Sequence, residues 1–411
     1  MTSASVQVVE PPVVRPASAR AYRLTSIDIL RGLVVVIMAL DHVRDHFHYG
    51  SVQDPMNDPN ISVALYLTRW VTHFCAPVFV CLAGVSAGLM TGRRNPASLG
   101  GFLLRRGLWI IVVELVVISL ATTFKLSGMP ETGGLILIPL QTLWAIGGSM
   151  LVLAGAQFLG RAACLALGVA IVAGHNLLDP VWPMTVNLFT PGPPLWVSLH
   201  AQMAWVARPF YVAIVYPLLP WVGVMLLGFG LSGVFQLEPG ERNQRLTLGG
   251  LAAVAVFVAL RASHVYGDPN PWMVQSAGVV PTILDFMNVS KYPPSLLFVL
   301  ATLGPAAVFC ARADRLPRGV RDVLVAYGRA PFAFYMVHFY VIHALAVMLG
   351  VLQGFKASQM MTLLIFFPKG YGVPLPAVYL VWFAVVASLY PLCRWVSAVK
   401  ARRTDWWLSY L

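Results

Sequence analysis

The sequence predicts an all-α membrane protein: a bundle of about ten transmembrane helices with both termini in the cytoplasm. Of its 411 residues, 58% are hydrophobic and only 11% are charged, less than half of the roughly one quarter that is usual in soluble domains. A net charge of +12 is also found in nucleic-acid-binding proteins, but so few charged residues cannot cover a soluble surface. The composition therefore indicates a polytopic protein of the lipid bilayer and excludes a nucleic-acid partner or a disordered chain.

Ten apolar segments approach or exceed the ~20 residues that a membrane span needs. Residues 180–207 also lack charged side chains, but five prolines with Trp182 and Trp196 favour a long interfacial loop. An eleventh span is expected only if residues 360–367 enter the bilayer. The predicted helices are residues 27–47, 66–91, 102–124, 134–158, 161–178, 207–235, 246–264, 293–312, 328–352 and 374–398.

The distribution of Lys and Arg predicts the orientation. If the N-terminus is cytoplasmic and the helices alternate in direction, 20 basic residues fall in cytoplasmic segments and 8 in outer segments. An even number of spans keeps the basic C-terminal segment inside, which favours ten over eleven. We expect a disordered cytoplasmic tail at residues 1–23, one membrane domain at 24–400 and a cytoplasmic tail at 401–411.

Ionisable groups inside spans mark candidate functional positions, because a charge at membrane depth is costly. The densest group closes the first helix, where helical spacing places Asp41 over Asp45 and His42 over His46. A carboxylate beside an imidazole fixes its tautomer and favours its protonation. His42, oriented by Asp41 or Asp45, is therefore predicted to be a general base. We interpret His46 and His48 as a solvated helix end.

The second helix supplies an alternative base, His73. Pro77 deprives the His73 carbonyl of its usual helical donor, and such breaks are tolerated where a helix lines a polar cavity. A core histidine bonded to a backbone carbonyl is the alternative interpretation. In the third helix, Glu114 must be protonated or paired, and Arg31 is one expected partner.

Polar residues near other predicted outer helix ends extend the candidate site. His338 or Asn176 is expected to polarise a carbonyl group by donating a hydrogen bond. The paired histidines of the first helix are only a weak metal signal, so no metal is predicted. The five cysteines lack a CxxC pair and are expected to be free thiols. The substrate-binding candidates are Asn176, Asp179, His338, Lys291 and Arg261.

Several segments, in order along the chain, resemble one known family. Residues 23–32 read Arg-Leu-Thr-Ser-Ile-Asp-Ile-Leu-Arg-Gly and precede a hydrophobic run that ends in Asp41 and His42. This start resembles the heparan-alpha-glucosaminide N-acetyltransferase catalytic-domain family, and more closely a bacterial branch of it whose function is unknown. The resemblance covers about residues 23–398. Further similar segments are 72–79, 175–179, 216–221, 266–269, 291–295 and 328–331.

The resemblance implies a transmembrane acyltransferase, in a bacterial cytoplasmic (inner) membrane. Such a protein takes an acetyl group from acetyl-CoA, or another acyl group from its acyl-CoA, on the cytoplasmic side. It passes the group to a sugar or amino-sugar on the far side. The family points to a histidine near the outer end of the first helix, and His42, His46 and His48 all satisfy that description, with His73 as the alternative.

The phosphates of the acyl-CoA donor call for cations, and one predicted cytoplasmic loop with its flanks is rich in arginine. A secondary transporter or flippase that uses the same intramembrane His and Asp groups is the alternative function. The acceptor, the acyl chain length, an acyl-histidine intermediate and a homodimer all stay open. The expected donor-binding residues are Arg93, Arg94, Arg105 and Arg106.

Overall fold

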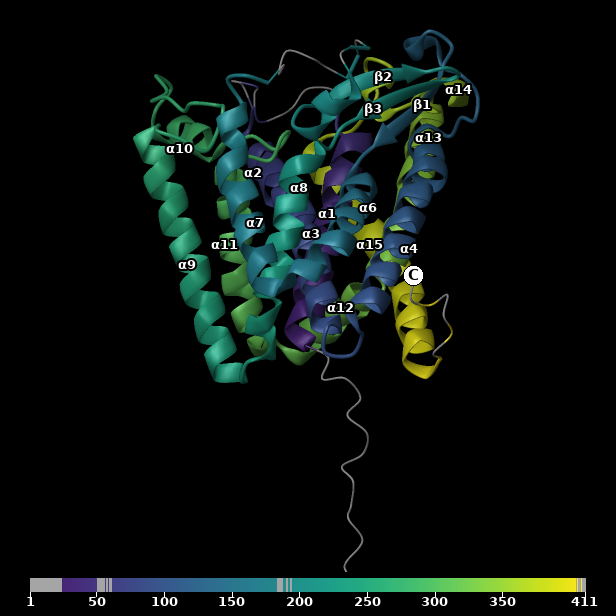
Figure 1. The fold of residues 1–411 in the computed structure, drawn as a ribbon. Helices are drawn as coiled ribbons and strands as arrows, with labels where there is room; N and C mark the ends of the chain where they lie inside the picture. Colours follow the sequence, from purple (N-terminus) through teal and green to yellow (C-terminus); the bar gives the residue numbers. More distant parts are fainter. Residues whose placement is uncertain are drawn as a thin grey trace, which may run out of the picture.

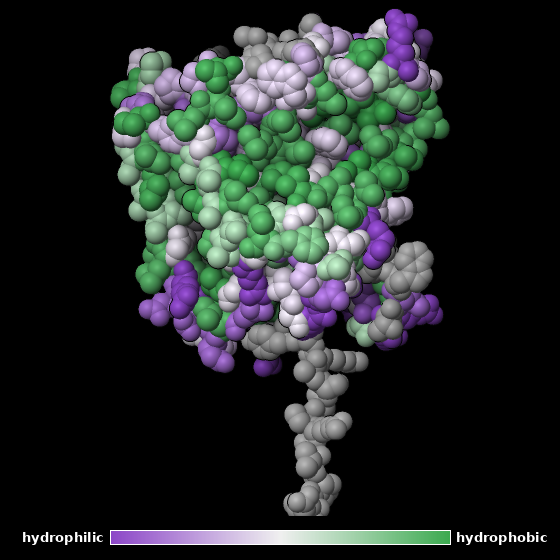
Figure 2. Space-filling view, viewed as in Figure 1, coloured by the Kyte–Doolittle hydropathy of each residue, from purple (hydrophilic) through white to green (hydrophobic). Residues whose placement is uncertain are grey.

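The computed structural model describes residues 24–49, 56, 58, 61–182, 188–189, 191–192, 194–403, 405 and 408. These residues form a helical bundle with a small sheet at one end (Figure 1). Seven helical segments among them are long and apolar enough to cross a membrane. Figure 2 shows an apolar belt between more polar ends. The prediction of a mostly helical integral membrane protein is confirmed. The predicted tail at 1–23 and most of 404–411 lie outside the described residues.

Most helices lie where the hydrophobic segments predict them, with short 3-10 or π-helical joints between some of them. α2 continues through η2 (Thr72–Phe74) into α3, and α4 continues through the π-helical η3 (Glu114–Ile118) into α5. The long helices are α1 (Thr25–Phe47), α3 (Cys75–Met90), α4 (Pro96–Val113), α6 (Thr142–Ala156), α7 (Gly160–Gly174), α8 (Leu218–Leu231), α9 (Pro239–Ser263), α11 (Leu296–Arg312), α13 (Pro331–Leu352) and α15 (Leu375–Arg402). The shorter ones are α2 (Val63–Val71), α5 (Ser119–Thr123), α10 (Val279–Met287), α12 (Arg318–Arg329) and α14 (Ala357–Met360).

The all-α prediction is wrong at one end of the bundle, where three strands pair. β1 (Ile136–Leu140), β2 (Met203–Ala207) and β3 (Phe210–Ile214) form a sheet in the order β1-β3-β2. β1 is parallel to β3, and β2 is antiparallel to it. The helices predicted to begin at 134 and 207 begin only at Thr142 and Leu218. Prolines 139, 209 and 217 explain the difference, because proline disfavours a helix interior but not an edge strand or a helix start.

α6 and α7 are two antiparallel helices, as the sequence predicts, joined by a tight turn. Gly160 lies at the turn with φ of +86°. The Cys164 thiol donates to the carbonyl of Ala156 at 3.2 Å, although eight residues of a straight helix span about 12 Å. The turn allows α6 to pack on α4 while α7 packs on α8.

α1 lies at the centre of the bundle and contacts α3, α11, α12, α13 and α15 (Figure 1). Its crossing with α12 depends on glycine. A Cβ atom at Gly32 would lie 1.9 Å from the carbonyl oxygen of Leu324, and one at Gly328 would lie 1.8 Å from that of Asp28. The sequence did not predict α12 as a separate helix, because its charged residues exclude a span.

The first and last helices share one end of the bundle. Arg329 Nε donates to Asp28 Oδ2 at 3.3 Å, and Lys400 Nζ donates to the Arg329 carbonyl at 3.3 Å. We call this the basic end and the opposite one, which carries β1–β3 and α10, the sheet end (Figure 1). The start of α1 and the end of α15 lie at the same end of the bundle, as an even number of spans requires. The compartment that each end faces stays a prediction from the charge distribution.

Candidate active site

The centre of the candidate site is a pair of histidines between α1 and α13. His42 Nδ1 lies 2.7 Å from His338 Nε2, and the two rings stack with centroids 4.9 Å apart. His338 Nδ1 faces the carbonyls of Tyr335 and Phe334 at 2.7 and 3.1 Å. A carbonyl only accepts hydrogen bonds, so Nδ1 of His338 carries its proton and Nε2 of the neutral ring accepts. The helix backbone thus fixes the tautomer of His338.

The same argument fixes the tautomer of His42. Its Nδ1–H donates to His338, so a neutral His42 keeps an unprotonated Nε2. His338 is fully buried, whereas His42 remains partly accessible. Phe339 packs on the His42 ring with centroids 4.3 Å apart. Within the described part of the chain, no hydrogen bond reaches His42 Nε2. The pair therefore presents one basic nitrogen to whatever lies beside it.

Asp41 pairs with arginines, not with His42. Its Oδ1 accepts from Arg44 at 3.0 Å and from the Thr72 hydroxyl at 2.8 Å. Its Oδ2 accepts from Arg69 Nη1 at 3.0 Å. A buried carboxylate is stable only with such a full set of donors. The predicted orientation of His42 by a carboxylate is not the observed arrangement; His338 occupies that role in the geometry.

Asp45 and the segment before α11 form the rim of this cluster. Asp45 pairs with Arg44, and its side chain is one quarter exposed. Lys291 lies over the ring of Tyr292, 5.2 Å from its centroid, and acts electrostatically on Asp41. Burial raises the pKa of Tyr292, so its hydroxyl keeps its proton. Asp45 thus lies at the Asp41–Arg44 cluster, and Lys291 lies within electrostatic range of both Asp41 and His42.

His73, the alternative base, lies in η2 between α2 and α3. It is 3% exposed, and its ring packs on Phe298 of α11 with centroids 5.2 Å apart. Its Nδ1 has no hydrogen-bond partner among the described residues. Arg69, Lys291 and Asp41 lie within electrostatic range of the His73 ring.

The interpretation of His46 and His48 as a solvated helix end is wrong. Both are buried, because the chain after α13 covers the end of α1. His46 Nδ1 donates to the His42 carbonyl at 2.8 Å, and its ring lies 5.6 Å from that of His343. His343 lies between two carbonyls, those of Ala121 and Met360, each 2.8 Å from a ring nitrogen. Histidines therefore continue from the pair toward the sheet end.

Asn176 and Asp179 belong to a separate polar cluster at the sheet end. Asp179 accepts from Asn176 at 2.9 Å and contacts His200 Nε2 at 2.8 Å. Asn176 in turn accepts from the backbone N–H of Leu296 at 2.9 Å, at the start of α11. These contacts tie α7 to α11 and to residues 195–200. His200 lies in the loop after α7 without any local motif, so no pattern in the sequence predicts its part in this cluster.

Arg261 supports a loop rather than the histidine pair. Its guanidinium donates to four backbone carbonyls, those of Asn270, Asp285, Phe286 and Asn288, at 2.5 to 3.1 Å. These donors hold residues 264–290 over α9. In the same loop, burial raises the pKa of Asp268.

Glu114 binds a helix start, not Arg31. Its two oxygens accept from the backbone N–H groups of Gln141 and Leu143, at 2.7 and 3.1 Å. These amides lack partners within α6, because they lie in its first turn. Arg31 instead donates to Asp28 and to Ser86, both at 3.3 Å. The predicted Glu114–Arg31 pair is wrong for this reason.

A cavity of about 350 Å³ opens at the basic end and reaches toward the histidine pair. Arg31, Arg106, Arg329 and Lys400 line it on the side of the basic end, and Thr142 and Tyr335 lie farther in. The Tyr335 ring is 5.6 Å from that of His338. Of the four predicted donor-binding arginines, only Arg106 lines this cavity. Arg93 and Arg94 line a different one, and Arg105 is exposed.

Comparison with known proteins assigns the chain to a family. No curated protein matches it. The family model described as "Heparan-alpha-glucosaminide N-acetyltransferase, catalytic" matches residues 23–266, more than half of the chain. The matched range contains His42, Asp41 and His73, whereas His338 follows it. The protein belongs to the heparan-alpha-glucosaminide N-acetyltransferase catalytic-domain family, which is one of transmembrane acetyltransferases.

Proposed function

We propose that the protein transfers an acetyl or other acyl group from acyl-CoA to a sugar or amino-sugar acceptor across the membrane. One observation carries the proposal: His338 fixes His42 with an unprotonated Nε2, and a cavity with a cationic mouth reaches Tyr335, whose ring lies 5.6 Å from that of His338. A neutral nitrogen at a fixed position is what general-base catalysis requires. Family membership supports the reaction class.

The donor fits the cavity at the basic end. Three phosphate groups of CoA carry negative charge, and Arg106, Arg329 and Lys400 offer guanidinium and ammonium partners. In the proposal the thioester extends inward toward Tyr335, which lines the cavity and whose hydroxyl would donate to the thioester oxygen. His338 cannot fill that role while its Nε2 accepts from His42, and Asn176 lies in the separate cluster.

In the proposed step, His42 Nε2 removes a proton from the acceptor amine or hydroxyl as that atom attacks the thioester carbon. The new C–N or C–O bond forms while the C–S bond breaks. His42 then returns the proton to the departing thiolate, which leaves as the CoA thiol. While His42 is charged, its hydrogen bond to His338 is charge-assisted and therefore stronger.

The acceptor would approach from the sheet end, where Asp45 and Lys291 form the rim. A carboxylate and an ammonium group are suited to hydroxyl and amino groups of a sugar. Donor and acceptor thus reach the histidine pair from opposite ends of the bundle, as transfer across a membrane demands.

Acetyl transfer by the purified protein tests the proposal. With radiolabelled acetyl-CoA and a panel of amino-sugars, we expect labelled product and CoA release from the native protein. His42→Ala should lower the rate by about 10²-fold or more, whereas His264→Ala, in the loop after α9, should not. Solute flux in proteoliposomes without CoA binding would refute the acyltransferase in favour of a transporter.

A further inference from the structure

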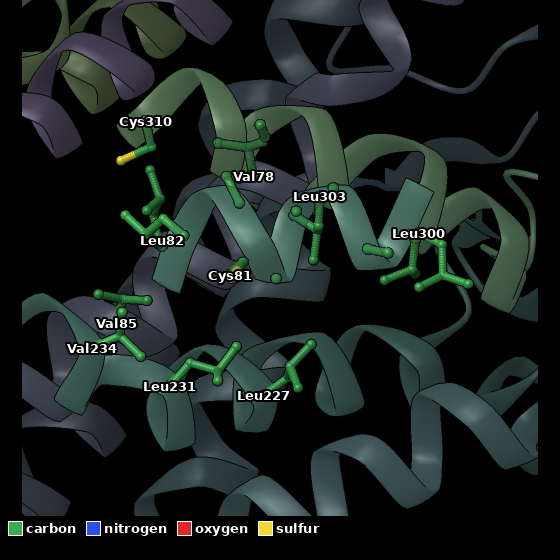
Figure 3. A pocket seen from close by; sticks show the side chains of 18 of the residues that line it. Val78, Cys81, Leu82, Val85, Leu227, Leu231, Val234, Leu300, Leu303 and Cys310 are labelled. Atoms are coloured by element: carbon green, nitrogen blue, oxygen red, sulfur yellow. The ribbon is translucent and has the colours of Figure 1, made fainter. Parts of the chain in front are cut away.

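A second cavity, of about 380 Å³, lies away from the histidine pair and is apolar (Figure 3). α9 packs on α11 and α7 packs on α8, and the groove between α7 and α9 is floored by α3 and α11. The labelled side chains in Figure 3, among them Cys81, Leu231, Leu303 and Cys310, bring only carbon and sulfur atoms to it. Val169 and Leu231 on its wall are exposed within the apolar belt. The groove therefore opens to the hydrocarbon of a bilayer.

Positive charge marks one end of this groove. Arg245 of α9 lines it and forms an exposed pair with Glu241. One turn earlier, Arg242 is only 3% exposed, and its Nη1 has no hydrogen-bond partner among the described residues. Its Nε donates to Asn243 Oδ1 at 3.4 Å. Arg242 lies behind the groove and does not line it, within electrostatic range of Cys310, which does. A buried cation without a carboxylate is costly unless an anion accompanies it.

We propose that the groove binds an anionic phospholipid, with one acyl chain along its apolar wall and its phosphate at Arg242 and Arg245. Basic pockets between transmembrane helices are suited to anionic headgroups. The volume lies within the range of small-molecule sites, about 300–1,000 Å³. The groove and the donor cavity share no lining residue, so the site is separate from the donor cavity and does not depend on the proposed reaction.

Two substitutions test the binding of the acyl chain and the binding of the phosphate separately. Gly249 lines the groove, and a Cβ atom there would meet nothing within 4 Å, so Gly249→Phe fills the space without a clash. Arg242→Gln removes the buried charge. Matched controls are Gly155→Phe, at an exposed glycine of α6 with the same open surroundings, and Arg318→Gln, at an exposed arginine of α12.

Native mass spectrometry and thermal denaturation of the delipidated full chain in detergent provide the test. We expect one phosphatidylglycerol per protein and a higher melting temperature when it binds. Phosphatidylcholine, inorganic phosphate and oleate should each bind at least about tenfold more weakly. Gly249→Phe and Arg242→Gln should weaken phosphatidylglycerol binding by about tenfold, and the two controls should not.

Four outcomes would overturn the proposal. If phosphatidylcholine binds as tightly as phosphatidylglycerol, the headgroup charge does not contribute. If inorganic phosphate binds as tightly, the acyl chain does not contribute. Unchanged binding in both groove variants would place the lipid elsewhere. Displacement of the phospholipid by oleoyl-CoA in the native protein, absent in Gly249→Phe, would make the groove a donor site.

Discussion

At the scale of single residues, the chemistry rests on which atom holds which proton. His338 accepts the Nδ1–H of His42, so in the proposed scheme it acts through His42 and not on the acceptor. The carbonyls of Tyr335 and Phe334 hold the His338 proton on the opposite nitrogen. The backbone of α13 thus fixes the tautomer of His338, and His338 in turn fixes the tautomer of His42. His338 is a positioning residue in this scheme.

Substitution of His338 tests that role. His338→Ala should lower kcat by about 10²-fold with little change in the KM for acetyl-CoA, because the base loses its orientation and its tautomer preference. His338→Gln retains an amide oxygen that can accept from His42 and should recover part of the rate. The pH profile of kcat separates this role from a structural one: it should change in His338→Ala. An unchanged profile with a lowered melting temperature would contradict it.

Asp41 holds α1 and α2 together through buried ion pairs. Asp41→Asn leaves Arg44 and Arg69 without their carboxylate and should destabilise the protein by about 3–5 kcal/mol. Glu241→Gln, which breaks the exposed pair with Arg245, should cost roughly 0.5 kcal/mol or less. Thermal denaturation in detergent measures both. Equal melting temperatures for the two variants would show that the buried pairs contribute no stability.

The sequence singled out Asp41, His42 and His338, because ionisable groups are rare inside spans. It could not predict their partners. Helical periodicity relates only neighbours on one helix, so it paired His42 with Asp41 and Asp45. The actual partner is 296 residues away, and a helix distant in sequence brings it there. Likewise Arg69, from α2, binds the carboxylate that periodicity had assigned to His42.

At the scale of elements, close backbone contact decides how α1 packs. Gly32 and Gly328 let α1 and α12 approach until a Cβ atom on either would overlap a carbonyl of the other helix. Small residues serve this purpose where helices cross in membranes. Since α1 also carries His42, its position against α12 affects the distance to α13.

Gly328→Ala tests this crossing. The added methyl group should force the helices apart and destabilise the protein by about 1–3 kcal/mol. Gly155→Ala, where a Cβ meets no atom within 4 Å, should leave the melting temperature unchanged or raise it. If Gly328→Ala has the same melting temperature as the native protein, the crossing of α1 and α12 tolerates a side chain and does not require glycine.

Hydrophobic segments were sufficient to predict most of the long helices, but not the strands. The uncharged segments around β1 and β3 were predicted as parts of membrane spans, because a strand buried in a small sheet and a helix buried in a bilayer both consist of apolar residues. Only the prolines at 139, 209 and 217 distinguished the two. α12 was missed for the opposite reason: its charges exclude a span but not an amphipathic helix at the bundle end.

At the scale of the whole molecule, the basic end and the sheet end differ in character, and the proposed reaction connects them. The cavity from the basic end is the proposed donor route, and Arg106 lines it while its neighbour Arg105 is exposed elsewhere. Arg106→Gln should weaken acetyl-CoA binding by about tenfold, as expected for loss of one charge-assisted contact. Arg105→Gln should bind as the native protein does. Isothermal titration calorimetry measures the affinity of both variants for acetyl-CoA. An equal loss of affinity in both would contradict binding of the donor in this cavity.

The orientation of the bundle can be read directly with single cysteines. The basic end should face the cytoplasm, because cytoplasmic segments carry the excess of Lys and Arg. In intact cells a membrane-impermeant maleimide should label Ser276→Cys, in the sheet-end loop before α10. It should label Ser98→Cys, in the first turn of α4 at the basic end, only after lysis. Both residues are exposed, and the reverse pattern would invert the topology.

The separation of His42 and His338 along the chain has a consequence for biosynthesis. A ribosome delivers α1 to the membrane long before α13 is synthesised. Asp41 and Asp45 then already have Arg44 on the same helix, whereas His42 still lacks His338, 296 residues farther along the chain. The stretch that the family model matches, residues 23–266, ends before the second histidine. A nascent chain that ended at that point would contain His42 without the ring that fixes its tautomer. If His42 is the base proposed above, the protein gains catalytic competence only late in its own translation, after most of its helices have been inserted.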